Sequence, residues 1–141
     1  MIQRVQTLYL LTAALLLGIF LGFADLWLAV AGAAFWGLEA AIYGLGGLTA
    51  VVALVAVFLY KQRATQAKVV LAAQWLDLVL VLVLAVAVGM LSFQSDVDLT
   101  EVGALGFAVL LLPVVAYAAL RMARLGVQKD IDLVRSMDRL R

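Results

Sequence analysis

The sequence contains no cysteine and no histidine, and only one proline among its 141 residues. The first two absences exclude disulfides, thiolate-bound clusters, histidine-ligated haem and the usual zinc and copper sites, because each needs a thiolate or an imidazole. They also exclude Ser–His–Asp and Cys–His nucleophiles. Acid–base chemistry is left to Asp, Glu, Lys and Tyr, with no evident nucleophile–base pair among them. We therefore expect neither an enzyme nor a resident cofactor or metal.

Charged residues are also scarce. They make up 13% of the chain, whereas hydrophobic residues make up 67%. Soluble domains are roughly 25% charged and 45–50% apolar. Four apolar stretches are long enough to span a bilayer as helices. We predict an all-α membrane protein with one four-helix transmembrane bundle over residues 1–120 and a tail over residues 121–141, the spans lying at about 7–24, 40–60, 69–93 and 101–120.

Basic residues are missing from two of the connections between these spans. All ten Lys and Arg residues lie before the first span, between the second and third, or after the fourth. In the other two connections every charged residue is acidic: Asp25, Glu39, Asp96, Asp98 and Glu101. Basic residues near span ends stay in the cytoplasm, since moving them across is unfavourable. We expect a multi-pass protein of the bacterial inner membrane with both termini cytoplasmic.

Small and aromatic residues mark the first half of the chain. Gly18 and Gly22 on the first span, and Gly44 and Gly47 on the second, predict close helix packing, because glycine lets two backbones approach. Between the spans, Trp27, Phe35 and Trp36 favour an interfacial segment on the outer face, since Trp prefers the headgroup level. An extension of either helix, and a small ligand pocket, stay open as alternatives over residues 26–39.

Asp77 is the one ionisable side chain inside a span, and Gln74 lies one turn earlier on the same face. A charged group near a bilayer centre costs roughly 2.5–3.5 kcal/mol on insertion scales, so such residues are functional candidates. Three interpretations stay open: a structural polar contact with Gln74, a contact with a partner subunit, and a proton or quinone-headgroup site. We favour the first, because no base or histidine in any span completes a relay.

Proline and glycine predict the shape of the last part of the chain. Pro113 should bend the fourth span, and Gly126 should end its helix. Beyond Gly126, apolar residues recur at helical spacing and alternate with charged ones. We predict a short amphipathic tail helix that docks on a protein partner rather than on lipid, through Val127, Ile131, Val134 and Met137, with Arg135, Arg139 and Arg141 at the rim.

Both ends of the chain resemble a known family. The start is Met1-Ile2-Gln3-Arg4 followed by Gln6-Thr7-Leu8-Tyr9-Leu10. The close is Lys129-Asp130, Leu133-Val134-Arg135-Ser136 and Asp138-Arg139-Leu140-Arg141. These motifs are similar to those of uncharacterised four-helix integral-membrane proteins, mostly from Bacteroidetes. The resemblance implies the fold and the membrane location, and it implies no mechanism.

The favoured function is a non-catalytic accessory or structural subunit of a larger inner-membrane complex. Respiratory or other energy-transducing complexes are the candidate hosts. The expected partners are other integral-membrane subunits and membrane lipids, with no nucleic acid. The alternative is a small transporter or channel component that uses Asp77 and Gln74, although few polar residues are available to line a path.

Overall fold

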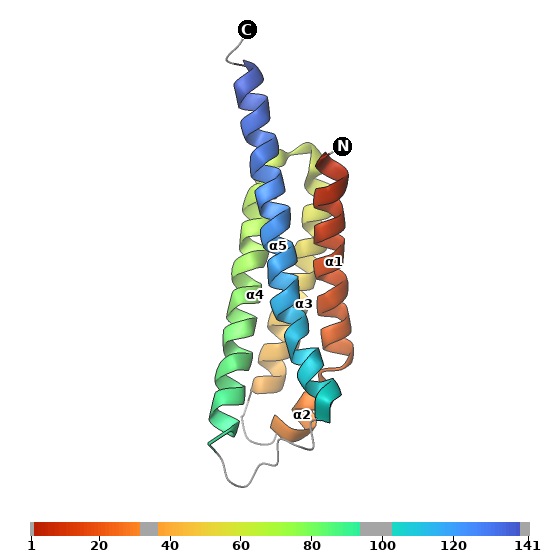
Figure 1. The fold of residues 1–141 in the computed structure, drawn as a ribbon, viewed down its shortest axis with the longest axis vertical. Helices are drawn as coiled ribbons and strands as arrows, with labels where there is room; N and C mark the ends of the chain where they lie inside the picture. The colour runs from red at the N-terminus through yellow and green to blue at the C-terminus, as the bar shows by residue number, and fades with distance from the viewer. Residues whose placement is uncertain (1, 32–36, 94–102, 139–141) are drawn as a thin grey trace.

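Helices make up nearly all of the structure, a computed structural model that describes residues 2–31, 37–93 and 103–138. No strand is present among these residues. Four helices are long and apolar enough to cross a membrane. The predicted all-α membrane fold is therefore confirmed. Figure 1 shows the elements in chain order: α1 (Ile2–Gly22), α2 (Asp25–Ala31), α3 (Leu38–Phe58), the 3-10 turn η1 (Leu59–Lys61), α4 (Arg63–Leu91) and α5 (Gly103–Asp138).

The four long helices form an antiparallel bundle in which each has two neighbours. α1 and α4 lie diagonally opposite each other, and both contact α3 and α5. α1 begins and α5 ends at the same end of the bundle (Figure 1). We call this the basic end, because α3 passes to α4 there through Lys61 and Arg63. The core consists of apolar side chains from all four helices, including Leu10, Leu17, Phe20, Ile42, Leu80, Leu91 and Leu120.

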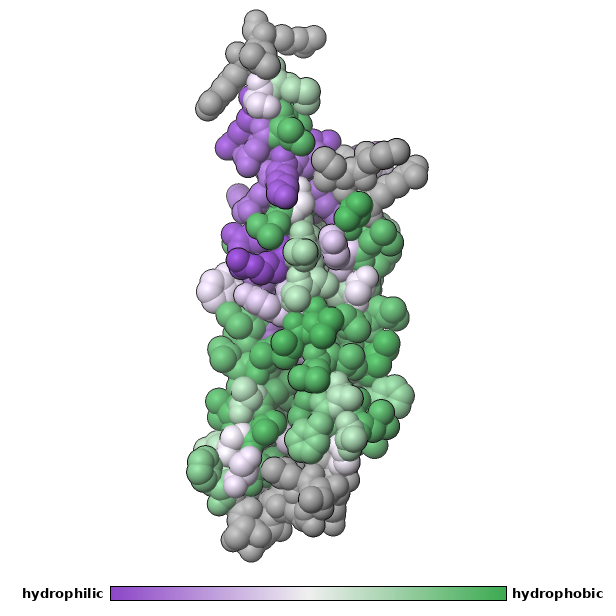
Figure 2. Space-filling model, in the orientation of Figure 1, coloured by the Kyte–Doolittle hydropathy of each residue, from purple (hydrophilic) through white to green (hydrophobic). Residues whose placement is uncertain are grey.

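The outside of the bundle is as apolar as its core. Leu15, Val51, Leu82 and Leu111 are all exposed. On the face that Figure 2 shows, hydrophobic residues form a wide belt, and hydrophilic residues gather towards the projecting end of α5. Such a surface is stable when lipid tails surround it. Because those tails are as apolar as leucine, packing contacts and hydrogen bonds, rather than exclusion from water, hold the helices together.

A separate short helix, α2, closes the end of the bundle opposite the basic end. Phe23 and Ala24 form a turn between α1 and α2, and the Tyr43 hydroxyl donates a hydrogen bond of 2.7 Å to Asp25 Oδ1. α2 is therefore not a continuation of α1, and residues 38 and 39 already belong to α3. Trp27 is only 1% exposed, so its ring fills the base of the core, and the prediction that it anchors at the lipid surface is wrong. Phe35 and Trp36 lie outside the described residues.

The connection between α3 and α4 is tighter than hydropathy predicts. The expected loop over residues 61–68 shrinks to η1 and Gln62, because α4 already begins at Arg63. The carbonyl of Ala56, in the last turn of α3, accepts the backbone N–H of Leu59 at the C-cap. Gln66 Nε2 donates a second hydrogen bond of 3.0 Å to the same carbonyl. Polar residues with good helix propensity thus extend α4 beyond its apolar part.

The last helix is continuous, contrary to the predicted break at Gly126. α5 runs from Gly103 to Asp138 and passes through Pro113, so the tail prolongs the fourth span instead of forming a helix of its own. Gly126 serves packing: a Cβ atom there would lie 2.8 Å from Gln6 Cγ on α1. The glycine that was expected to end the helix lets α5 pass close to α1.

Candidate functional site

Polar side chains of α4 and α5 meet in the half of the bundle nearer the basic end. Gln74 on α4 is only 5% exposed. Its Nε2 donates a hydrogen bond of 3.1 Å to the Tyr117 hydroxyl on α5. Its Oε1 is buried and has no hydrogen-bond partner among the described residues. Gln74 therefore joins the two helices and still has one acceptor free.

Asp77 lies one turn further along α4 and is fully buried, with 0% exposure. Neither of its carboxylate oxygens has a hydrogen-bond partner among the described residues. The hydrogen bond expected between Gln74 and Asp77 is absent, because Gln74 bonds to Tyr117 instead. Whether Asp77 has a structural or a functional role stays a prediction. No cluster of three acidic side chains that could hold a metal ion occurs in the described part of the chain.

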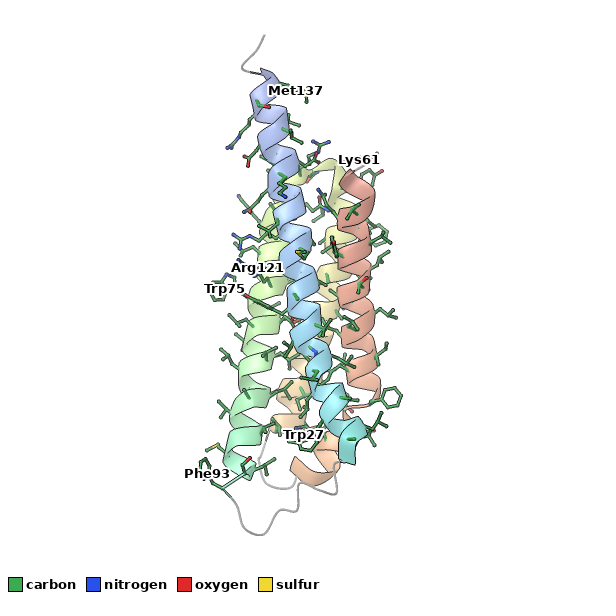
Figure 3. All side chains as sticks on the ribbon, viewed as in Figure 1. Trp27, Lys61, Trp75, Phe93, Arg121 and Met137 are labelled. Carbon is green, nitrogen blue, oxygen red and sulfur yellow. The ribbon has the colours of Figure 1, made fainter. Side chains whose placement is uncertain are left out.

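Two residues mark the level at which the apolar belt ends. Trp75 on α4 is 60% exposed, and Arg121 on α5 lies beside it (Figure 3). At about 1.5 Å per residue, Trp75 is about 24 Å from Leu91, the last residue of α4, and Arg121 is about 27 Å from Gly103, the first residue of α5. Both distances approach the thickness of the hydrocarbon core, about 30 Å. Gln74 and Asp77 therefore lie close to one membrane surface rather than at its centre.

A small pocket opens between α4 and α5 at this level. It has a volume of about 170 Å³ and is lined by Gln74, Trp75, Tyr117, Arg121 and Arg124, with Leu71 and Leu78 as its apolar walls. No acidic residue lines it. The ion pair of the described residues joins Arg63 to Asp130, 3.2 Å apart, so neither pocket arginine has an acidic partner there. The pocket offers hydrogen-bond donors and positive charge, which suits an anion.

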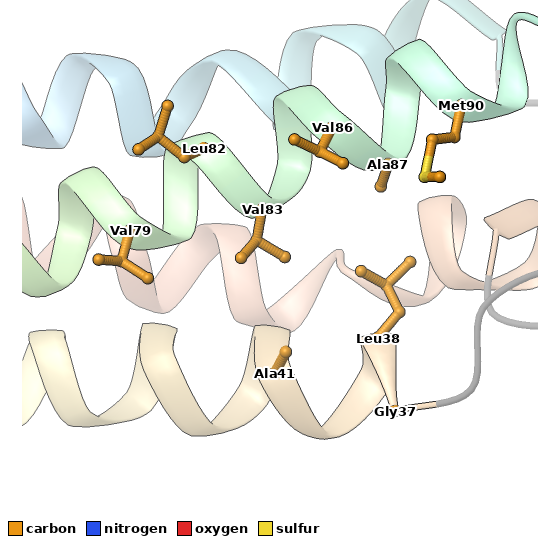
Figure 4. Close-up of a pocket in the computed structure, with 9 residues that line it drawn as sticks. All are labelled: Gly37, Leu38, Ala41, Val79, Leu82, Val83, Val86, Ala87 and Met90. Carbon is orange, nitrogen blue, oxygen red and sulfur yellow. The ribbon is translucent and has the colours of Figure 1, made fainter.

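A larger pocket of about 430 Å³ lies between α3 and α4, towards the opposite end of the bundle. Figure 4 shows that its walls are aliphatic and include Leu38, Val83, Val86 and Met90. No charged side chain lines it. In a bilayer this hollow faces hydrocarbon, so lipid tails would fill it, and it offers no group for chemistry.

Comparison with known proteins places the chain in a family. Residues 2–140 match the model of a domain of unknown function, DUF4293. The chain belongs to this family. The expected resemblance to an uncharacterised family is confirmed, and the match extends over nearly the whole chain. No curated protein and no solved structure matches the chain. The family's description assigns no activity, so function has to be argued from the residues themselves.

The glycines that were predicted to pack between helices lie elsewhere. A Cβ atom added at Gly18, Gly22, Gly44 or Gly47 would meet nothing within 4 Å. Their predicted packing within this chain is therefore wrong. The close approach occurs at Gly46, where a Cβ atom would lie 2.9 Å from Leu21 Cδ2. Spacing groups glycines on one face, but in a helix that is apolar all round it does not show which face turns inward.

The predicted docking stripe on α5 divides into two parts. Val127 is 1% exposed and belongs to the interior of the bundle, so it is not free to dock a partner. Val134 and Met137 are exposed, and Ile131 is half-buried. Leu133, which the helical spacing missed, is exposed as well. Arg135 is exposed, whereas Arg139 and Arg141 lie outside the described residues.

The sequence alone does not predict the pocket at Arg121 and Arg124, which we call the arginine pocket. In the sequence these two bases indicate only which side of the membrane they occupy, and no motif marks Tyr117. The available signal was their spacing: positions 117, 121 and 124 recur every three to four residues, which places their side chains on one face of a helix. Which helix that face meets could not be read from the sequence.

Proposed function

We propose that this protein is a non-catalytic subunit that assembles with other integral-membrane proteins in the bacterial inner membrane, with its basic end in the cytoplasm. The partition of Lys and Arg supports this orientation. The observation that carries the assembly proposal is the end of α5, which projects past the other helices (Figure 1). Leu133, Val134 and Met137 lie exposed on this projecting part.

Exposed apolar residues on this part of α5 are surrounded by a different solvent from those in the belt. In the belt, lipid tails surround them. Beyond Arg124 the helix carries Lys129, Asp130, Asp132 and Arg135, and hydrophilic residues gather there (Figure 2), so its surroundings are aqueous. Burying a large apolar side chain stabilises by about 1.5–3 kcal/mol. A partner that covers Leu133, Val134 and Met137 therefore gains this free energy for each side chain that it buries.

The balance of charge favours a protein partner over the lipid surface. Attraction to anionic lipid is worth about 1 kcal/mol per base. After Gly126 the chain carries four bases against three acids, of which Asp130 pairs with Arg63. This mixed charge makes a poor polybasic patch for anionic lipid. The outward glycines add support, because Gly18, Gly22 and Gly44 would let a partner's helix approach the bundle closely. Respiratory and other energy-transducing assemblies are the hosts to examine first.

The alternative role in transport has less support. The buried polar side chains of the described residues are Gln6, Thr49, Gln66, Gln74 and Asp77. Three of them make hydrogen bonds to backbone carbonyls or to Tyr117. A transport path needs a continuous set of polar groups from one side of the membrane to the other, and this set is too small to supply one.

The test is a truncation designed on the structure. A stop codon at position 133 removes the exposed apolar residues but keeps Val127 in the core and Asp130 in its ion pair with Arg63. Tagged full-length and truncated chains are solubilised in mild detergent, and co-purifying proteins are quantified by mass spectrometry. We expect the truncated chain to insert and fold normally while recovery of its partners falls at least tenfold.

Point variants separate the apolar contacts from the charges. Met137→Asp should lower partner recovery strongly, because it places a charge in the apolar contact. Arg135→Ala should lower it less, since exposed ion pairs are worth about 0–1 kcal/mol. Asp132→Asn, an exposed polar position on the same helix, serves as the control. Partner recovery at the wild-type level with the truncated chain would show that α5 is not the docking element.

A further inference from the structure

We propose that the groove between α4 and α5 binds one anionic phospholipid, with its headgroup in the pocket at Arg121 and Arg124 and an acyl chain along the apolar groove beyond it. Two pockets on the same pair of helices carry this proposal. It concerns a ligand of the chain itself and does not depend on a partner protein, so it can fail or hold independently of the proposed assembly role.

The first pocket presents donors suited to a phosphodiester. Arg121 and Arg124 line it and have no acidic partner among the described residues. Guanidinium groups bind phosphate oxygens in a fixed, paired geometry. The Tyr117 oxygen accepts its hydrogen bond from Gln74 Nε2, so its own O–H stays available to donate. Three donor groups from one face of α5 therefore converge on a space of about 170 Å³.

Gln74 adds a second, independent feature. It is 95% buried, it lines this pocket, and its Oε1 has no hydrogen-bond partner among the described residues. A buried acceptor without a hydrogen bond is unfavourable. Because this oxygen has almost no accessible surface, the amide has to turn towards the pocket to receive a donor. A headgroup that carries hydroxyls, such as the glycerol of phosphatidylglycerol, then supplies that donor next to its phosphate. Gln74 thus favours a hydroxyl-bearing anionic headgroup over one that lacks a donor.

The second pocket continues the groove away from the basic end. It measures about 130 Å³, and its walls are entirely aliphatic: Val81, Leu84, Ala85, Val88, Leu110 and Val114. On α4, positions 74, 78, 81, 85 and 88 repeat every three to four residues, and on α5 positions 117, 114 and 110 do the same. Both pockets therefore lie along the same two helix faces. The cationic pocket followed by an apolar groove matches the anionic headgroup and the acyl chain of a phospholipid.

The depth of the pocket agrees with a headgroup. Trp75 lines the pocket and is largely exposed, and exposed Trp favours the membrane–water interface. Figure 3 shows Trp75 and Arg121 next to each other at this level. Basic pockets between membrane helices on the cytoplasmic side are a recognised form of anionic headgroup site. A free phosphate ion would use the first pocket alone and would leave the aliphatic one without a role.

The experiment measures lipid binding to the purified full-length chain in detergent by native mass spectrometry. Dioleoyl phosphatidylglycerol is the probe, and dioleoyl phosphatidylcholine is the neutral comparison. We expect one phosphatidylglycerol per chain, bound at least tenfold more tightly than phosphatidylcholine. Arg121→Gln with Arg124→Gln should weaken phosphatidylglycerol binding at least tenfold. The matched control, Lys129→Gln with Arg135→Gln, removes the same charge outside the pocket and should change binding less than twofold.

Two further arms locate the acyl chain and identify the source of the anion. Ala85→Phe fills the aliphatic pocket and should weaken phosphatidylglycerol binding about fivefold. Sodium phosphate at 10 mM should not displace the lipid. Displacement by phosphate, with no effect of Ala85→Phe, would replace the lipid site by a free-anion site.

Equal affinity for the two lipids, or equal effects of the pocket and control pairs, would overturn the proposal. Helix content by circular dichroism verifies that each variant is folded. If the double variant unfolds, Tyr117→Phe replaces it, since it removes one pocket donor and should weaken binding about threefold. Unchanged binding by Tyr117→Phe would then count against the site.

Discussion

At the residue scale, Asp77 differs from three other buried polar side chains, Thr49, Gln66 and Gln74. Thr49 and Gln66 bond to backbone carbonyls, and Gln74 bonds to Tyr117. Asp77 is fully buried without a partner among the described residues. A buried polar group without a hydrogen bond costs free energy, and a charge costs more. In isolation, Asp77 therefore lowers the stability of the bundle.

This cost predicts the effect of replacing Asp77. Asp77→Leu should raise the free energy of unfolding by about 1–3 kcal/mol, the cost of an unsatisfied buried group. Asp77→Asn keeps the size and an acceptor, so its effect should be much smaller. Thermal unfolding in detergent measures both. A clear loss of stability in Asp77→Leu would show that the carboxylate has a stabilising partner. If the leucine variant folds but its host complex loses activity, Asp77 has a functional role.

Gly126 allows a second prediction at this scale. Alanine usually stabilises a helix by about 1 kcal/mol relative to glycine, but here its Cβ atom would lie 2.8 Å from Gln6 Cγ. Overpacking of this kind costs about 1–3 kcal/mol. Gly126→Ala should therefore lower the unfolding temperature, and Gln6→Ala should restore it in the double variant. Gly44→Ala, where a Cβ atom meets nothing within 4 Å, should not lower it. Equal effects at the two glycines would contradict the close α1–α5 contact.

Residues of this kind mark the limit of prediction from this sequence. Glycine spacing predicted packing at Gly18 and Gly22, yet both face outward, and Gly46 makes the close contact. In soluble proteins the polar face of a helix shows which side is outside. Here both sides are apolar, so the sequence does not show which face turns inward. The bond between Gln74 and Tyr117 likewise joins residues 43 positions apart, which no local pattern encodes.

At the scale of elements, hydropathy predicted the four long helices but misplaced their ends. α4 begins at Arg63 and α5 continues to Asp138, both well into polar sequence. Hydropathy reports where lipid contact ends, whereas a helix continues as long as its backbone hydrogen bonds and propensities allow. The projecting part of α5 is tied to the bundle by Val127 in the core and by the ion pair of Asp130 with Arg63.

The buried Val127 and the ion pair of Asp130 with Arg63 predict that protection of backbone amides from hydrogen exchange falls along α5. Hydrogen exchange in detergent should be slow up to about Val127 and should become at least a hundredfold faster over residues 133–137. Short helices without tertiary contacts are only marginally stable in water. Asp130→Asn should move the start of fast exchange towards Val127, although the loss in overall stability should be no more than about 1 kcal/mol. Uniform protection up to residue 137 in the isolated chain would mean that α5 needs no partner to stay ordered.

At the scale of the whole molecule, the orientation in the membrane rests on the charge partition. Every base lies on one side of the four predicted spans. In the structure, α1 begins, α3 passes to α4 and α5 ends at the same end of the bundle, the basic end (Figure 1). Moving a single charge against the membrane potential costs about 2.3 kcal/mol per 100 mV. This cost is the physical argument for the proposed orientation, in which the basic end lies in the cytoplasm.

The natural absence of cysteine makes this orientation simple to test. Thr65 is exposed in the first turns of α4 at the basic end, and position 97 lies in the acidic connection between α4 and α5. Single cysteines at these positions are treated in intact cells with a thiol reagent that does not cross the inner membrane. The cysteine at position 97 should react in intact cells, and the cysteine at position 65 only after the membrane is opened.

Val79→Cys, exposed in the apolar belt, should react poorly in both conditions, because thiolate formation is suppressed in lipid. Reaction at position 65 but not at position 97 would invert the molecule, and the arginine pocket and the projecting end of α5 would then face the periplasm.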